Sequence, residues 1–154
     1  MTVEITVADD RVPRGIAAPL RSLIRATLAL ERARAAEIGL LLADDAALRE
    51  LNRRWRRIDR ATDVISFPYF VGQRGRIRLV AGDLAISMDR SLEQARRYRV
   101  TRGRELARLV IHGTLHLVGH DHHRLAPRRV MRAQEARALR AARDTIRALD
   151  ARLG

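Results

Sequence analysis

The amino-acid sequence predicts a single α+β domain in which a small, mixed four-stranded sheet packs with about five helices. Its 154 residues are an ordinary length for one domain and include no Ser- or Gly-rich linker and no internal repeat. Short alternating or β-branched segments occur between longer segments with helical spacing. The apolar, His-bearing segment 102–118 predicts a buried central helix.

The N-terminal part of the chain is expected to alternate strands with helices. Residues 3–7 alternate apolar and polar side chains, as a half-buried strand does, and helical spacing follows over 17–36. The continuous apolar segment 37–43 predicts a strand that is buried on both faces. Asp44 and Asp45 then provide a cap for a following helix.

The rest of the chain is expected to add two strands and three helices. Residues 62–67 are rich in β-branched and aromatic side chains, and they predict a strand that ends at Pro68. A turn at 72–75 leads to a strand over 77–88. The remaining helices are expected over 89–99, over 102–118 and from Pro127 through an apolar stripe that reaches Leu149.

The composition favours an anionic partner and limits the kinds of metal site. All 31 basic residues are Arg, and with 18 acids the formal charge is +13, which favours nucleic acid first and anionic lipid second. A codon bias explains the choice of Arg over Lys, but not the excess of Arg over acids. The absence of Cys excludes disulfides and thiolate zinc sites, so a metal must be held by His and carboxylates.

The start of the chain and its apolar segments predict a cytoplasmic protein. The first ten residues contain no basic leader followed by a long apolar stretch, so no signal peptide is expected. The longest apolar segments, such as 38–43, are far below the roughly 20 residues that a membrane-spanning helix needs.

All five His lie between positions 112 and 123. His112 and His116 are four residues apart and therefore share one face of the expected helix, which is the spacing of two imidazoles that bind one metal ion. Gly119 is expected to end the helix, so that the chain folds back and brings His122 to the same ion. Three protein ligands and one open position are typical of catalytic zinc, although nickel, cobalt, copper and iron also suit imidazole.

The alternative interpretation is a His-rich surface segment without a metal. The segment 109–118 is apolar nearly all round, which indicates a buried helix, and a buried His needs a partner or a metal. This favours metal binding. His120 could flank the site, and His123 could compete with His122 as the third ligand.

Position 113 argues against peptide hydrolysis. Metalloproteases with two helical His place a Glu after the first of them as the general base, whereas this chain has Gly113 there. Metal-bound water is still acidified by the ion, so hydrolysis of another substrate is compatible with the sequence.

Arginines and acids elsewhere supply further candidates. Four arginines before the strand at 62–67 have the spacing i, i+3, i+4 and i+7, which would align them on one helical face to bind phosphate: Arg53, Arg56, Arg57 and Arg60. A solvated charged face is the alternative. A second basic group could follow a nucleic-acid backbone around Tyr98: Arg96, Arg97, Arg99, Arg102 and Arg104. Three acids are candidates either for structural hydrogen bonds or for orienting a metal-bound His: Asp63, Asp83 and Glu135.

Three segments together resemble the YbeY family of bacterial endoribonucleases, which are ribosomal RNA maturation factors. They are HGTLHLVGHDH at 112–122, LNRRWRRIDRATDVISFP at 51–68 and AGDLAIS at 81–87. The resemblance covers most of the chain. It implies one α+β domain over residues 1–154, a zinc or related ion held by three His, and cleavage of single-stranded RNA. It also implies roles in maturation of the 3′ end of small-subunit ribosomal RNA and in ribosome quality control, hence contact with the ribosome.

The resemblance also implies roles for individual residues. The metal ligands are matched by His112, His116 and His122, and the Arg that is important for activity is matched by Arg56. The chain departs from the family at position 120, where His replaces the usual Tyr, and at position 61, where Ala replaces Pro. The expected function is therefore a metal-dependent endoribonuclease; the alternative is a non-catalytic ribosome- or RNA-binding assembly factor with a structural metal.

Overall fold

The computed structural model describes residues 1–120 and 125–154, with side chains omitted at 70–71 and 125–126. The strands are β1 (Thr2–Val7), β2 (Ala33–Ala43), β3 (Val64–Arg74) and β4 (Ile77–Ser87). The helices are α1 (Ala17–Leu30), α2 (Asp45–Arg56), α3 (Met88–Tyr98), α4 (Arg102–Val118), α5 (Leu125–Ala141) and α6 (Arg143–Leu153), with a short 3₁₀ helix, η1 (Arg14–Ile16).

The four strands form one mixed sheet in the order β1-β2-β4-β3 within the described residues. β2 pairs in parallel with both β1 and β4, whereas β3 is antiparallel to β4 and lies at the edge. In this register Ile38 lies between Val3 on β1 and Gly82 on β4. The predicted α+β class and mixed four-stranded sheet are confirmed.

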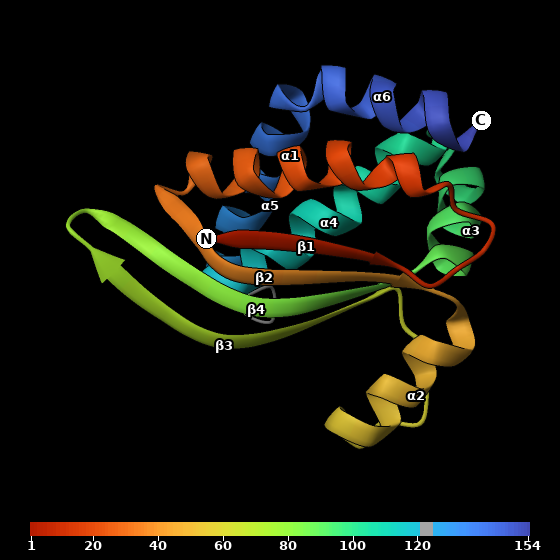
Figure 1. The fold of residues 1–154 in the computed structure, drawn as a ribbon, viewed down its shortest axis with the longest axis horizontal. Coiled ribbons are helices and arrows are strands. Elements are labelled where there is room, and N and C mark those ends of the chain that lie inside the picture. The colour runs from red at the N-terminus through yellow and green to blue at the C-terminus, as the bar shows by residue number, and fades with distance from the viewer. Residues whose placement is uncertain (121–124) are drawn as a thin grey trace.

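Helices cover the two faces of the sheet unequally. α1 and α4 lie on one face with α5 and α6 packed on them, while α2 lies below the opposite face (Figure 1). Alternation along β4 explains this division, because Leu84 and Ile86 enter the large core with α4, whereas Ala85 enters a small cluster with Leu48 of α2. The predicted buried His-bearing helix is confirmed as α4. No helix among the described residues is long and apolar enough to span a membrane.

The predicted helix over 17–36 is wrong at its C-terminal end. α1 ends at Leu30, and Arg32 has a left-handed backbone with φ of 53°. From Ala33 the chain is extended, and its backbone pairs in parallel with β4, beginning opposite Arg78, rather than continuing as a helix. The strand predicted at 37–43 therefore begins four residues earlier.

Two later elements differ most from prediction, and the turn predicted at 72–75 is wrong, because residues 72–74 still pair with β4. β3 continues through Pro68 to Arg74, because β3 is an edge strand and Pro68 lies at a register shift opposite Gly82. The helix predicted after Pro127 is interrupted at Ala142, so its apolar stripe is divided between α5 and α6.

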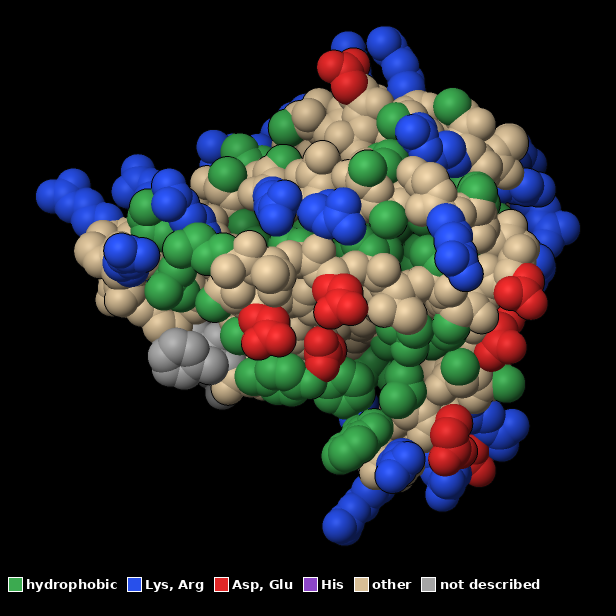
Figure 2. All heavy atoms as spheres, in the orientation of Figure 1, with side chains coloured by type: hydrophobic (Ala, Val, Ile, Leu, Met, Phe, Trp, Pro, Cys, Tyr) green, Lys and Arg blue, Asp and Glu red, His purple; other side chains and the backbone are tan. Residues whose placement is uncertain are grey.

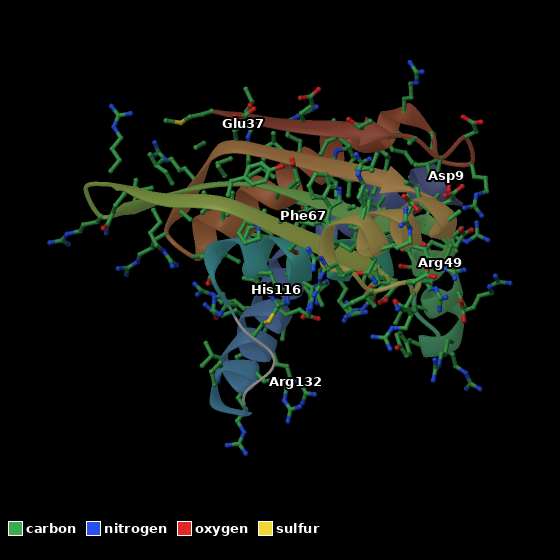
Figure 3. The ribbon with its side chains drawn as sticks, turned by 90° about the horizontal axis from the view of Figure 1, so that it is seen from below. Asp9, Glu37, Arg49, Phe67, His116 and Arg132 are labelled. Carbon is green, nitrogen blue, oxygen red and sulfur yellow. The ribbon has the colours of Figure 1, made fainter. Side chains whose placement is uncertain are left out.

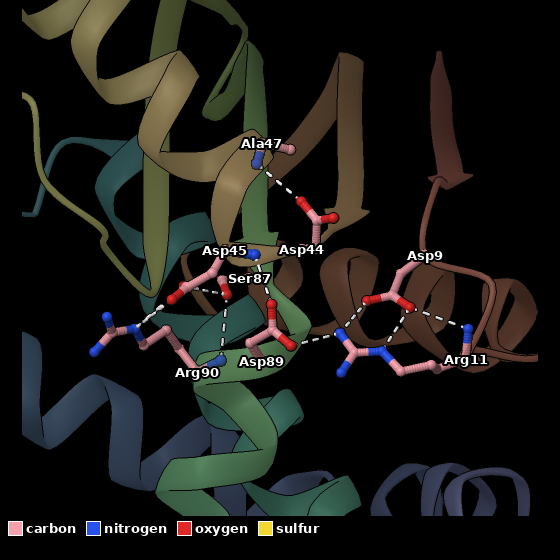
Figure 4. A network of polar contacts seen from close by, with 8 residues as sticks. All are labelled: Asp9, Arg11, Asp44, Asp45, Ala47, Ser87, Asp89 and Arg90. Carbon is pink, nitrogen blue, oxygen red and sulfur yellow. Dashed lines mark hydrogen bonds and ion pairs between the residues drawn. The ribbon is translucent and has the colours of Figure 1, made fainter.

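A network of carboxylates and arginines joins the loop after β1 to the starts of α2 and α3 (Figure 4). Arg11 Nε donates to Asp9 Oδ1 at 2.9 Å, and Arg11 Nη2 lies 2.7 Å from Asp89 Oδ1. The other oxygen of Asp89 accepts the backbone N–H of Asp45 at 2.7 Å. Hydrogen bonding by Arg11 lowers the pKa of Asp9, and the Asp45 N–H together with Arg11 lowers the pKa of Asp89.

These lowered pKa values predict an acid-dependent loss of stability. Both carboxyls contribute stability above their unfolded pKa of about 3.9, and this contribution is lost as the pH falls through their lower folded values. We expect Arg11→Gln to reduce the difference in free energy of unfolding between pH 6 and pH 3, measured by urea denaturation. Arg14→Gln, at an exposed position of η1, is the matched control and should retain the wild-type difference.

Candidate metal centre

Helix α4 brings His112 and His116 together on one partly exposed stripe of an otherwise buried helix. Its N-cap is Thr101, whose hydroxyl accepts the N–H of Arg104 at 3.1 Å, and its C-cap is Gly119, which has φ of 110°. One helical turn separates the two imidazoles, and their ring centroids are 4.8 Å apart with an interplanar angle of 71°. Figure 3 shows His116 on α4 where α5 passes beside it. The predicted pairing of these two His is therefore present in the structure.

The carboxylate of Glu135 on α5 orients His112. Its Oε2 lies 3.0 Å from Nδ1 of His112, and both side chains are largely buried. Burial opposes ionisation of Glu135, but the hydrogen bond with His112 and the charge of Arg108 outweigh it, so its pKa lies below the usual value. An ionised carboxylate only accepts hydrogen bonds, so Nδ1–H donates, and Nε2 is the ring nitrogen left for a metal ion.

Glu135 is itself held by a buried ion-pair network. Arg108 Nη1 lies 3.5 Å from Glu135 Oε1, and Arg108 donates two hydrogen bonds of 2.8 Å to Glu105. Glu105 is only 2% exposed, and its hydrogen bonds raise the pKa of Arg108. Arg108 and Glu105 thus hold the Glu135 carboxylate in place, and this carboxylate in turn orients the His112 ring. Metal-bound His are commonly oriented by carboxylates in this way. Sequence reasoning left the role of Glu135 open and did not identify Arg108 or Glu105.

His120 belongs to a separate polar cluster beyond the end of α4. Its Nε2 forms a hydrogen bond with Glu31, whose other oxygen accepts Gln134 Nε2 at 2.6 Å. Arg78 donates to the backbone carbonyls of Glu31 and Val118, at 3.1 and 3.4 Å. Through Glu31, His120 therefore links the chain after α4 to the end of α1 and to Gln134 on α5. His120 is the last described residue before 121–124.

The other proposed ligand positions, His122 and His123, lie outside the described residues. Within residues 1–120 and 125–154, no group of three or more His, Asp or Glu side chains is arranged to hold a metal ion. The observed donor set nevertheless fits an imidazole-binding ion, because two rings share one helical stripe and one of them is oriented through Nδ1 by a carboxylate.

The predicted alignment of four arginines on one helical face is wrong. α2 ends at Arg56, and Arg57 has a left-handed backbone with φ of 58°, so Arg57 and Arg60 lie beyond the helix. Arg53 forms an ion pair with Glu50 at 2.6 Å. All four arginines are exposed, and Figure 2 shows arginines projecting from the rim of the viewed face, including the α2 end.

The structure places α2 and α4 on opposite faces of the sheet (Figure 1). No hydrogen bond or ion pair in the described part of the chain links Arg56 with His112 or His116. Both helices contact the edge strand β3, so the two predicted elements of the site flank one edge of the sheet.

Comparison with known proteins assigns the chain to a family. The family model described as endoribonuclease YbeY matches residues 4–143. The chain belongs to the YbeY endoribonuclease family. Among YbeY relatives, the proteins named endoribonuclease YbeY from Roseiflexus sp. (strain RS-1) and Carboxydothermus hydrogenoformans are 40% and 37% identical to it. These matches cover 91% and 90% of this chain, and 92% and 95% of the relatives.

A solved structure supports the fold independently of these YbeY relatives. The solution structure of TM1509 from Thermotoga maritima is 22% identical and superposes with a TM-score of 0.68. The superposition covers 96% of this chain and 93% of that one. The likeness confirms the α+β architecture on which this YbeY family member positions its His pair.

Packing explains why this YbeY chain has Gly beside its first His. A Cβ at Gly113 would lie 2.9 Å from a methyl carbon of Leu84 and 3.2 Å from one of Val64. Ser66 also donates from its hydroxyl to the Gly113 carbonyl, at 3.3 Å. Position 113 faces the sheet at close approach, so it has no room for the Glu that a metalloprotease would use there.

Two acids that the sequence offered as candidates have other partners. Asp63 accepts the N–H of Val64 at 2.8 Å and the side chain of Gln94 at 3.1 Å, which links β3 to α3. Asp83 accepts the Tyr69 hydroxyl and lines a cavity of about 640 Å³ on the α2 side of the sheet. Among the three candidate acids, only Glu135 contacts a His of the pair.

Proposed function

We propose that this protein is a metal-dependent endoribonuclease that cleaves single-stranded RNA. The observation that carries the proposal is the His112–Glu135 hydrogen bond beside His116, on a chain of the YbeY endoribonuclease family. The whole chain, residues 1–154, serves as one domain with this activity. Its substrate is ribosomal RNA, at the 3′ end of the small-subunit RNA, with a further role in ribosome quality control in the cytoplasm.

The ion would be held by His112, His116 and His122, and Zn²⁺ matches the imidazole ligands best. When bound, it supplies an acidified water and a positive charge for a phosphate oxygen. Glu135 keeps Nδ1 of His112 protonated, so the ring presents Nε2 in a fixed orientation. Catalytic roles are assigned to His112, as a ligand, and to Arg56, which binds the scissile phosphate.

The remaining arginines of the α2 end bind the RNA strand next to the cleavage point. Arg53, Arg57 and Arg60 are exposed and supply phosphate contacts, with the contribution of Arg53 reduced by its ion pair with Glu50. An RNA strand that crosses the sheet edge at β3 reaches both α2 and α4, because both helices contact β3.

A second candidate function is a non-catalytic assembly factor that binds the ribosome or its RNA and carries a structural metal. The position of the arginines favours it, since they lie across the sheet edge from the His pair and can bind RNA without cleaving it. This alternative predicts RNA binding without turnover, and unfolding when a chelator removes the metal.

The test measures metal content and cleavage of a labelled single-stranded RNA by the purified full chain. We expect about one bound ion per chain, cleavage that stops on chelation and returns with Zn²⁺, and a fold that survives chelation by circular dichroism. Arg56→Ala should lower kcat/KM at least tenfold through loss of a charge-assisted phosphate contact, whereas the exposed Arg74→Ala at the end of β3 should not. RNA binding without cleavage by the metal-loaded protein would favour the assembly factor instead.

A further inference from the structure

A cavity of about 500 Å³ lies between three helices, apart from the His pair. Its rim carries Arg104 from α4, Arg140 from α5, and Arg143 and Arg147 from α6. α4, α5 and α6 lie on the same side of the sheet, where α5 and α6 both pack against α4 (Figure 1). Positions that are 43 residues apart in sequence thus contribute guanidinium groups to one hollow, where Leu139 and Ile146 form an apolar floor.

The positive charge in this cavity is nearly uncompensated. Within the described part of the chain, the guanidinium groups of Arg104, Arg140 and Arg143 have no hydrogen-bond or ion-pair partner. Arg147 has a long contact of 3.8 Å with Asp144, and both of these side chains are strongly exposed. Like charges around one cavity repel one another, so an anion that enters it is attracted by several guanidinium groups at once.

Some arginines elsewhere in the described part of the chain are neutralised by carboxylates, unlike those of this cavity. Arg11, Arg49, Arg53, Arg90 and Arg108 are all paired with carboxylates. Guanidinium groups match the oxygens of oxyanions such as phosphate bidentately, so converging unpaired arginines favour an oxyanion over a halide. The cavity thus has the charge and the donors of a phosphate-binding site.

The cavity lies in line with the His pair along α4. Arg104, Arg108 and His112 follow one another at i, i+4 and i+8, so they form one gently winding stripe on the helix. Eight residues of helix place Arg104 about 12 Å from His112 along the axis. Arg108 lies between them, but it is engaged by Glu105 and Glu135. On this stripe of α4, Arg104 at the cavity is therefore the arginine without a carboxylate partner that follows His112.

We propose that Arg104, Arg140, Arg143 and Arg147 bind a backbone phosphate of the RNA substrate a few nucleotides from the bond that is cleaved. This inference rests on the proposed endoribonuclease function and adds a second contact on the same strand. The site reads no base, since its donors are guanidinium groups and its floor is aliphatic. It extends the RNA-binding surface to the face of the sheet opposite α2.

The chain offers a matched control in a second arginine-lined cavity, of about 750 Å³. Arg25, Arg32, Arg34 and Arg76 line it, from α1, the start of β2 and the β3–β4 turn. None of its lining residues comes from α4 or α5, which hold His112 and Glu135. Two arginines can thus be replaced in each cavity. The two variants then lose the same charge, but only one of them loses it from the proposed phosphate site.

The experiment compares Arg140→Gln/Arg143→Gln with Arg25→Gln/Arg76→Gln in the metal-loaded full chain. Binding of a 2′-O-methylated single-stranded RNA, chosen to resist cleavage, is measured by fluorescence anisotropy between 50 and 300 mM salt. Each phosphate contact on a single strand contributes about 0.7 to the slope of log K against log salt, so loss of this one contact in the first pair should lower the slope by about 0.7. Its affinity near 0.1 M salt should fall about fivefold, whereas the control pair should change both values much less.

Cleavage kinetics give a second readout. The Arg140→Gln/Arg143→Gln variant should raise KM with kcat little changed, because a contact made equally in the ground and transition states contributes to binding alone. Equal losses of affinity in the two pairs, or an unchanged salt slope in the first pair, would overturn the proposal. If the wild-type chain binds RNA but does not cleave it, the proposed catalytic function fails, while the difference in salt slope still decides the role of the cavity.

Discussion

RNA cleavage is expected to fall more than 100-fold when His112 is replaced by Ala, with the fold retained. Removing an outer partner of a metal-bound His typically costs 10- to 100-fold in metal affinity or activity, so removing the ring itself should cost more. Ala is the best helix former, and the His112 side chain is about one quarter exposed, so α4 should remain folded. The measurements are bound metal per chain, kcat/KM on single-stranded RNA, and the circular dichroism spectrum.

A graded series separates the ring from its support. Glu135→Gln keeps a side chain that can still accept from Nδ1–H but removes the charge, so its metal affinity should fall less than that of Glu135→Ala. Both should retain more affinity than His112→Ala, and the exposed Arg74→Ala should match the wild type. If Glu135→Ala binds metal as tightly as the wild type, the hydrogen bond seen here does not orient a ligand. Unchanged cleavage by His112→Ala would exclude the proposed centre altogether.

The His pair was predictable because its geometry is local. Four residues of helix place His112 and His116 one turn apart in any α-helix, and the apolar residues around them indicate that the helix is buried. Glu135 could only be named as a candidate, because its contact with His112 joins two helices across 23 residues of chain. Glu31 and Arg108 gave no signal in the sequence at all, since acids and arginines are abundant and only tertiary packing selects these two.

The errors in the fold have local physical causes. Arg32 adopts a left-handed backbone conformation that favours Gly or Asn, so the turn after α1 carries no sequence signal. Pro68 normally ends a strand, but an edge strand with a register shift tolerates it. The arginines after α2 keep the spacing of a helical face, although the helix ends at Arg56 and Arg57 is left-handed. Periodicity alone does not show where helical backbone hydrogen bonding stops, so the sequence predicted a longer helix.

The packing of α6 on α4 predicts a loss of stability for Gly103→Ala. Gly103 is buried in the first turn of α4, where its N–H donates to Asp150 Oδ1 at 2.7 Å. A Cβ there would lie 2.8 Å from both the backbone nitrogen of Asp150 and the backbone oxygen of Ile146. Backbone atoms have no alternative rotamer, so α6 must shift, and overpacking of this kind costs about 1–3 kcal/mol. Urea denaturation should show this decrease in the free energy of unfolding at an unchanged m-value.

Gly15→Ala is the matched control, because a Cβ there meets only the flexible end of Arg152, at 3.4 Å. This variant should be neutral, or slightly stabilising through the lower entropy of its unfolded chain. Gly103→Ala should also weaken RNA binding by the arginine cavity, since Arg143 and Arg147 move with α6 while Arg104 stays on α4. A normal free energy of unfolding for Gly103→Ala would mean that α6 can retreat from α4 at no cost, and the three-helix cavity would then lack a fixed shape.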